Sequence, residues 1–193
     1  GGSRFILPQA TREAVLPLQW MKPHFMDDEG RLKMSVHAFV IETPSRRIVV
    51  DTCIGNDKQG RFVPTWNNLQ GPFLRDLAAA GFARESIDTV MCTHLHVDHV
   101  GWNTLLEDGS WKPTFPQARY LFSETEFDYW ATQLEGYANL ADSLDPNSLP
   151  FQVMKMMTAT HADSVQPLVD AGLVDLVSST HALCPGIVLM PTP

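Results

Sequence analysis

The sequence predicts an α/β domain, in which the short strands of a sheet alternate with helices. Apolar runs with the length of strands occur in order along the chain, at residues 32–41, 47–50, 88–93 and 118–122. Segments with helical spacing and helix-end signals lie between and after these runs. A hydrophobic content of 44% in 193 residues supplies enough apolar side chains for the core of one domain.

The first half of the chain is predicted to form a hairpin, a loop and a helix. Residues 32–41 alternate apolar and polar side chains and then become continuously apolar, which is typical of a strand that enters a core. Residues 43–46 predict a turn, and residues 47–50 predict the returning strand. The polar and aromatic residues 56–71 predict a loop beside the functional site. The segment 72–81 predicts a short helix, because a proline stands at its start and a glycine at its end.

The second half is predicted to add strands and a longer helical region. Residues 118–122 predict a strand, and the sequence SETE at 123–126 is typical of a capping box that opens a helix. Residues 135–171, which prolines interrupt, predict a helical insertion or lid. The last strands are expected at residues 173–177 and 187–190.

The segment HLHVDH at residues 94–99 contains four potential metal ligands and follows directly on a predicted buried strand. Alternation along the chain sends His94, His96 and Asp98 to one side. His99 reaches the same region only if the backbone turns there, as it does on entering a helix. Imidazole nitrogens and carboxylate oxygens bind zinc at about 2.0–2.2 Å. A structural zinc site is disfavoured, because such sites are usually rich in cysteine and no cysteine accompanies this segment.

Two segments of the chain resemble the metallo-β-lactamase superfamily. THLHVDHVG at 93–101 resembles the metal-binding signature of that family, and RIVVDTCIG at 47–55 resembles the strand that runs into its Asp-Thr-Gly turn, with Cys53 where Gly is commoner. The resemblance covers residues 30 to 123 well. It implies the αβ/βα sandwich of the metallo-β-lactamase fold, of which the chain holds the first portion only. It also implies a hydrolase with two zinc ions per complete active site, nearer to lactonases and organophosphate or aryl-ester hydrolases than to β-lactamases.

The resemblance also implies roles for individual residues. His94 and His96 would bind the first metal, and Asp98 and His99 the second. Asp98 would in addition be catalytic, by passing a proton toward the leaving oxygen, and Asp51 would accept a hydrogen bond from a ligand imidazole. Zinc held in this way produces hydroxide at neutral pH, which would attack an ester, lactone or organophosphate. No substrate-binding residue is assigned, and other divalent metals are compatible with these ligands.

The family's later ligands are not found in this sequence. The family completes its two metal sites with a His of a later Gly-His motif, a bridging Asp and a further His, whereas residues 189–193, LMPTP, resemble the strand that leads into the Gly-His motif. We therefore expect residues 1–193 to form a single incomplete domain, with GGS at 1–3 as a cloning remnant. We expect the chain alone to be a poor enzyme unless a complementing segment or a second copy of the chain completes the site. If residues of the chain itself replace the missing ligands, His161 and His181 are the first candidates.

Composition narrows the remaining function classes. A net charge of −8 with dispersed basic residues argues against a nucleic-acid partner and leaves a small-molecule substrate as the expected one. No stretch has the 18 or more apolar residues of a membrane span, although a removed signal peptide leaves export undecided. The alternative function is a non-catalytic metal-binding or interaction module that lacks a complete active site.

Overall fold

The computed structural model describes residues 6–192, apart from the side chain of Asp142. The chain divides into two compact units, Gly1–Val36 and His37–Pro193. The predicted cloning remnant at residues 1–3 lies outside the described residues. Among the described residues, no helix is both long enough and apolar enough to cross a membrane.

In the N-terminal unit, the described residues form short elements only. Helix α2 (Arg12–Val15) and the 3-10 turn η1 (Gln19–Met21) are followed by a bridge between Met26 and Leu32. Val15 and Met26 are its buried apolar side chains, whereas Trp20 is largely exposed. The predicted strand at 32–41 forms ladder pairs only from Phe39 onward, so its first half was predicted wrongly.

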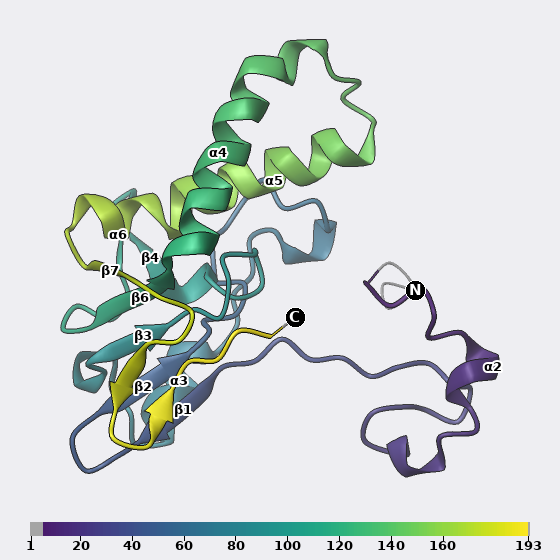
Figure 1. Ribbon diagram of the computed structural model, residues 1–193, viewed down its shortest axis with the longest axis horizontal. Coiled ribbons are helices and arrows are strands. Elements are labelled where there is room, and N and C mark those ends of the chain that lie inside the picture. The colour runs from purple at the N-terminus through teal and green to yellow at the C-terminus, as the bar shows by residue number, and fades with distance from the viewer. Residues whose placement is uncertain (1–5, 193) are drawn as a thin grey trace. The chain divides into compact units, whose positions relative to one another are not determined.

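The larger unit is built on a sheet that has five strands within the described residues (Figure 1). In spatial order these strands are β1 (Phe39–Glu42), β2 (Arg47–Val50), β3 (Thr89–Met91), β6 (Arg119–Ser123) and β7 (Val174–Val177). β1 and β2 form the predicted antiparallel hairpin, and β2, β3, β6 and β7 are parallel. Because the strands are parallel, the loops after β2 and β3 leave the sheet at the same edge.

Helices cover one face of this sheet (Figure 1). They are α3 (Phe73–Ala79), α4 (Glu124–Leu140), α5 (Leu149–Ser164) and α6 (Gln166–Asp170). The connecting segments of this unit contain the 3-10 turns η2 (Pro64–Trp66), η3 (Arg84–Ser86), η4 (Gly101–Asn103) and η5 (Ala141–Ser143). The predicted helix at 72–81 is confirmed by α3, and Gly81 follows it with a φ of +94°. The helix predicted to open at residues 123–126 is α4, and with α5 it forms a helical hairpin that extends away from the sheet (Figure 1).

Two small hairpins complete the described part of this unit. They are β4 (Thr104–Glu107) with β5 (Ser110–Pro113), and β8 (Ala182–Cys184) with β9 (Ile187–Val188). Sequence analysis missed the first hairpin, although its Asp108-Gly109 turn has positive φ angles at both residues, as a two-residue hairpin turn requires. Its strands are short and largely exposed, so they give no apolar run.

The core lies on both faces of the sheet. Val49, Val90 and Tyr120 are fully buried on the face that α3 to α6 cover. Their sequence neighbours Ile48, Met91 and Leu121 form a second cluster on the opposite face, against which side chains of the β8–β9 region pack. A sheet that buries both faces needs strands that are apolar at consecutive positions, as these are.

Candidate metal-binding site

The segment HLHVDH leaves the sheet at the carboxyl end of β3. Leu95 and Val97 are buried in the core, whereas the histidines between and beside them are half-buried or exposed. This alternation is the one predicted from the sequence. The turn that follows is tight, because the His99 N–H donates to the His96 carbonyl at 3.0 Å. It leads into η4, a single 3-10 turn, instead of the predicted α-helix.

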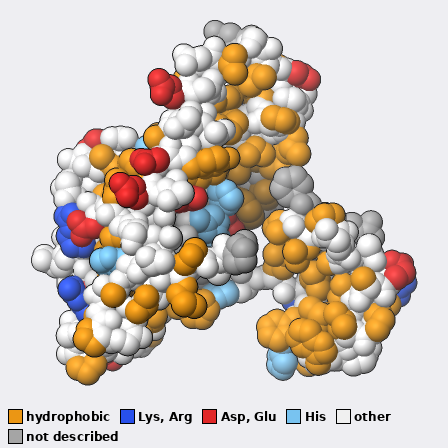
Figure 2. Space-filling model, in the orientation of Figure 1, with side chains coloured by type: hydrophobic (Ala, Val, Ile, Leu, Met, Phe, Trp, Pro, Cys, Tyr) orange, Lys and Arg blue, Asp and Glu red, His pale blue; other side chains and the backbone are white. Residues whose placement is uncertain are grey.

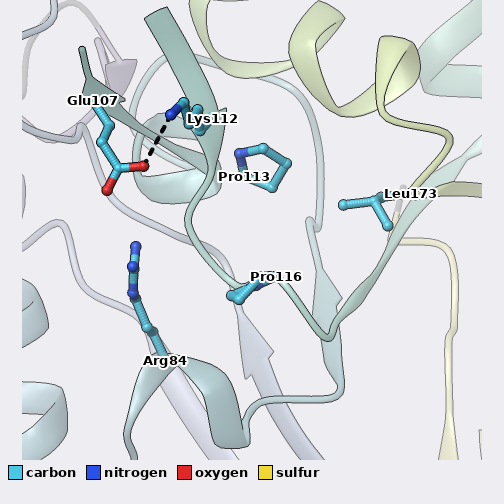
Figure 3. A pocket seen from close by; sticks show the side chains of 6 residues that line it. All are labelled: Arg84, Glu107, Lys112, Pro113, Pro116 and Leu173. Atoms are coloured by element: carbon cyan, nitrogen blue, oxygen red, sulfur yellow. Dashed lines mark ion pairs between the residues drawn. The ribbon is translucent and has the colours of Figure 1, made fainter.

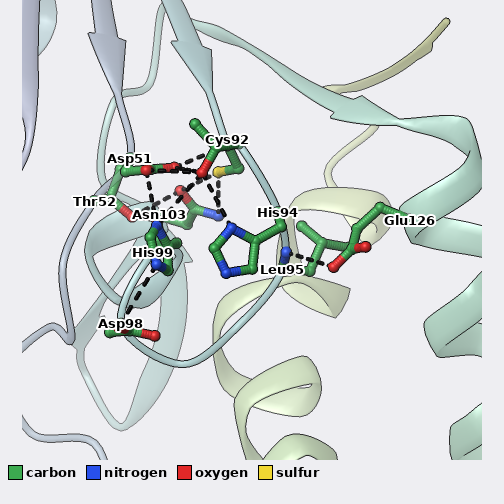
Figure 4. A network of polar contacts seen from close by, with 10 residues as sticks. Asp51, Thr52, Cys92, His94, Leu95, Asp98, His99, Asn103 and Glu126 are labelled. Atoms are coloured by element: carbon green, nitrogen blue, oxygen red, sulfur yellow. Dashed lines mark hydrogen bonds and ion pairs between the residues drawn. The ribbon is translucent and has the colours of Figure 1, made fainter. Parts of the chain in front are cut away.

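The imidazole rings of the segment lie close together, and Figure 4 shows those of His94 and His99 side by side. The ring centroids of His94 and His96 are 4.6 Å apart, and those of His94 and His99 are 3.9 Å apart. Figure 2 shows histidine surface on the exposed face of the larger unit, bordered by hydrophobic side chains. The protein thus presents several nitrogen donors at one point of the sheet edge.

A second pair of donors faces this group. His99 Nε2 lies 3.5 Å from Asp98 Oδ2. Two ligand atoms that bind one tetrahedral zinc at about 2.0–2.2 Å are about 3.4 Å apart. His99 and Asp98 therefore fit a shared metal ion in both donor type and spacing.

The structure does not arrange the four candidate donors as a closed cage. Within the described residues, no group of three or more His, Cys, Asp or Glu side chains is arranged to hold a metal ion. Their imidazole nitrogens and carboxylate oxygens are donor types that zinc binds. The assignment of His94, His96, Asp98 and His99 as metal ligands remains a prediction.

Asp51 orients His99 from the end of β2. Its Oδ2 lies 2.8 Å from His99 Nδ1, and its carboxylate also accepts hydrogen bonds from the backbone N–H and the hydroxyl of Thr93 (Figure 4). With Asp51 as the acceptor, Nδ1 carries a proton and Nε2 faces Asp98. This is the contact that the sequence analysis expected of Asp51.

Burial and neighbouring side chains shift the protonation of His99, Asp98 and His94. Burial alone would lower the pKa of His99, but hydrogen bonds to Asp51 and Asp98 outweigh it and raise that pKa to about 9. Burial would raise the pKa of Asp98, but the hydrogen bond and charge of His99 lower it overall. Burial lowers the pKa of His94, and the neighbouring His99 and His96 act in the same direction. Without a metal, His99 is therefore a cation held between two carboxylates, and a metal ion must displace its proton.

Two backbone segments cross tightly beneath these side chains. Thr52 N–H donates to the His99 carbonyl at 2.7 Å, and Gly101 N–H donates to the Cys53 carbonyl at 2.7 Å. A Cβ on Gly101 would lie 1.8 Å from the backbone carbon of Ile54, so only glycine fits there. The crossing fixes the loop after β2 against the loop after β3.

Glu126 is a site residue that sequence analysis missed. It was assigned to the capping box, but the Ser123 side chain forms no capping hydrogen bond to the described helix. Glu126 Oε1 accepts instead from the backbone N–H of Leu95 at 3.0 Å and from the indole of Trp130 at 2.8 Å. The contact with Leu95 joins residues 31 positions apart, so no local pattern could have revealed it.

The two histidines proposed as local substitutes belong to other elements of the unit. His161 lies in the last turn of α5. Its ring centroid is 6.3 Å from that of Phe127, and burial lowers its pKa. His181 lies in the connection between β7 and β8.

The loop predicted beside the site is anchored by a buried ionic cluster. The side chains of Lys58 and Arg61 are fully buried. Lys58 Nζ donates to Thr104 Oγ1 at 2.6 Å and to the Asp163 carbonyl at 2.9 Å, and it lies 3.6 Å from the centre of the Trp111 ring. Arg61 Nη2 donates to Asp163 Oδ1 at 2.9 Å. This cluster connects the loop to α5 and to the β4–β5 hairpin.

A separate pocket lies away from the histidine loop (Figure 3). Its volume is about 260 Å³, and its lining residues are Arg84, Glu107, Lys112, Pro113, Pro116 and Leu173. Lys112 and Glu107 form an ion pair at 3.3 Å across part of its wall. None of the predicted metal ligands lines this pocket.

Comparisons with solved structures show where this fold occurs. "Hydrolase AbOPH in beta lactamase superfamily" is 21% identical, with a TM-score of 0.58 over 84% of this chain and 50% of that one. The dizinc quorum-quenching lactonase AidC is 20% identical, with a TM-score of 0.55 over 91% of this chain and 53% of that one. A "probable metal-dependent hydrolase from Staphylococcus aureus" is 17% identical, with a TM-score of 0.54 over 93% and 57%. At these identities the likeness shows the fold.

A comparison of the sequence with models of protein families shows the family of this chain. The chain spans about half the length of the structures it matches, so it carries part of their fold. A comparison with curated proteins gave no significant match. The model of the metallo-beta-lactamase superfamily matches residues 32–187, which include both motifs and most of the larger unit. The chain therefore belongs to the metallo-β-lactamase superfamily.

Proposed function

We propose that this chain is part of a metal-dependent hydrolase whose metal centre includes the loop at residues 94–99. The observation that carries the proposal is the grouping of the His94, His96 and His99 rings at the sheet edge, with Asp98 beside His99 and Asp51 behind it. Membership of the metallo-β-lactamase superfamily supports the same conclusion.

The proposed roles follow from the donor positions. His94 and His96 hold one divalent ion, and Asp98 and His99 hold a second, with zinc as the expected metal. When bound, such ions lower the pKa of a coordinated water to about 7 and polarise the oxygen of the substrate. Asp51 keeps the proton on Nδ1 of His99, so that Nε2 offers its lone pair. Asp98 passes a proton toward the leaving oxygen of the substrate.

The proposed substrates are esters, lactones or organophosphates. A hydrolase and a quorum-quenching lactonase among the similar structures support this class for the whole protein. The helical hairpin of α4 and α5 overlaps residues 135–171, which the sequence predicts as an insertion or lid, but it begins earlier, at Glu124. We propose that it forms one wall of the substrate site.

A metal titration followed by an activity panel tests this function. The purified chain is loaded with zinc, its metal content is measured by ICP-MS, and an aryl ester, a lactone and an aryl phosphotriester are assayed with and without a chelator. Binding of close to two zinc ions with chelator-sensitive hydrolysis supports the proposal. Asp98→Asn should abolish most of the activity, whereas His24→Ala, which removes an exposed histidine of the N-terminal unit, should leave it unchanged.

Two observations favour the alternative of a non-catalytic metal-binding or interaction module. Among the described residues, no three His, Cys, Asp or Glu side chains are arranged to hold a metal ion, and the chain spans about half the length of its structural relatives. In that case a complementing segment or a second copy would be needed to complete the site. Light scattering on the same sample gives the oligomeric state, and absence of both zinc and hydrolysis would select this alternative.

A further inference from the structure

The first turn of α4 carries a carboxylate that does not serve the helix. The sequence SETE at 123–126 has the form of a capping box, in which the glutamate bonds back to the start of its own helix. In the structure, the Glu126 carboxylate points toward the loop of metal-ligand candidates (Figure 4). Glu126 is half-buried, so this contact is formed in a partly water-excluded environment.

The contact of Glu126 falls between two predicted ligands. Its Oε1 accepts the backbone N–H of Leu95 at 3.0 Å, and Leu95 stands between His94 and His96. Leu95 is only 2% exposed, so packing holds its side chain in the core while the hydrogen bond to Glu126 holds its backbone. A hydrogen bond to an ionised carboxylate is stronger than a neutral one.

The same oxygen also places an aromatic ring against the loop. Glu126 Oε1 accepts the Trp130 indole N–H at 2.8 Å, one helical turn further along α4. The Trp130 ring meets the His96 ring edge to face, with centroids 5.5 Å apart. One carboxylate oxygen therefore holds both the backbone beside His96 and the ring that packs on it.

We propose that Glu126, acting with Trp130, is a positioning residue that fixes the His94-Leu95-His96 backbone for metal binding. The assignment rests on the proposed function, because it presumes that His94 and His96 bind a metal. Metal ligands must be held within about 0.5 Å of their productive positions, and outer partners of this kind commonly contribute 10–100-fold to metal affinity. Glu126 also couples α4, the proposed wall of the substrate site, to the metal loop.

Four variants of the full chain test the role. Glu126→Ala removes the acceptor, and Glu126→Gln keeps a carbonyl oxygen at the same position. Trp130→Phe keeps the ring but removes its N–H. Glu124→Ala is the matched control, because Glu124 lies exposed in the same helical turn.

The first measurement is amide hydrogen exchange of the metal-free protein. Loss of a hydrogen bond to a charged group should make the Leu95 amide exchange about 10–100-fold faster in Glu126→Ala. Glu126→Gln should restore most of the protection, and Glu124→Ala should not change it. Unchanged protection of Leu95 in Glu126→Ala overturns the proposal. If Glu126→Ala fails to fold, Glu126→Gln is compared with wild type, and a Leu95 amide protected at least as well as in wild type overturns the proposal, because a neutral acceptor forms the weaker hydrogen bond.

The second measurement is metal binding. Zinc affinity from competition with a chromophoric chelator should fall about 10–100-fold in Glu126→Ala, and the visible spectrum of the Co²⁺-loaded protein should change. Glu126→Gln should recover both properties to within a few-fold, which a general loss of stability would not do. Equal affinity in Glu126→Ala and wild type overturns the role. If the wild type binds no zinc, the proposed function fails, and the exchange result still decides whether Glu126 positions the loop.

Discussion

Removal of the Asp163 carboxylate should strongly destabilise the larger unit. Asp163 Oδ1 accepts from Arg61 at 2.9 Å and from the Ser164 hydroxyl at 2.6 Å, and it lies 3.6 Å from Lys58 Nζ. Both basic side chains are fully buried, so Asp163→Ala leaves Arg61 as a buried cation without its counter-charge and also removes the carboxylate beside Lys58. Breaking a buried ion pair by removing one partner typically costs about 3–5 kcal/mol.

Thermal unfolding measures this cost. In a chain of this size, each kcal/mol lowers Tm by about 2–4 °C, so circular dichroism should show a fall of about 6–20 °C. The control is Asp170→Ala, which removes an exposed carboxylate on α6 and should change stability by less than about 0.5 kcal/mol. Adding Lys58→Met to Asp163→Ala should recover part of the loss, because one buried basic group without its acidic partner is then gone. A fall in Tm below about 2 °C for Asp163→Ala would refute the reasoning.

Three other perturbations give measurable outcomes. Burial lowers the pKa of Lys58 to about 7, against an ordinary value of 10.5 in the unfolded chain. Between pH 7 and pH 10.5, Lys58 is therefore protonated in the unfolded chain and largely neutral in the folded protein. Because the unfolded chain binds more protons, this residue makes the free energy of unfolding rise from pH 7 to pH 9, by up to about 1.4 kcal/mol per pH unit. Urea titrations of the metal-free protein should show this rise weakened in Lys58→Met, and an identical pH dependence in both proteins would contradict it. Asp98→Asn should reduce hydrolysis by the zinc-loaded enzyme about 10²–10⁴-fold with an unchanged circular dichroism spectrum, and near-normal turnover at full metal loading would reject the role of Asp98. Gly101→Ala should lower the free energy of unfolding by more than about 3 kcal/mol, because its Cβ would overlap the backbone of Ile54. Gly136→Ala in α4 is the control, because its Cβ meets open space and should be neutral or slightly stabilising. Equal Tm values for the two variants would show that the backbone crossing at Gly101 can relax.

Local patterns predicted the parts of the fold that depend on neighbouring residues. The strands β2 and β6 and the helix α3 follow from apolar runs and end signals, and they were predicted nearly at their observed bounds. The alternation of Leu95 and Val97 with the histidines follows from the period of an extended chain. The contact between Asp51 and His99 was expected from the family resemblance, since their spacing alone does not reveal it.

The features that were missed depend on distant partners. Lys58 donates to a carbonyl 105 positions away, and an isolated lysine in a polar loop gives no sign that it will be buried. Glu126 fitted a local capping rule so well that its long-range partner was hidden. Residues 32–38 have the alternation of a strand but lie outside the ladder, because pairing and not pattern decides where a strand begins.

The two ends of the histidine loop also differ in when they can form during synthesis of the chain. His99 is held by Asp51 and by the crossing at Gly101, so all of its partners have been made once residue 103 has been added. The His94-Leu95-His96 end waits for Glu126, which follows about 1–5 s later at ordinary rates of translation. The half of the loop that carries Asp98 and His99 can therefore reach its native shape while the other half is still free to move.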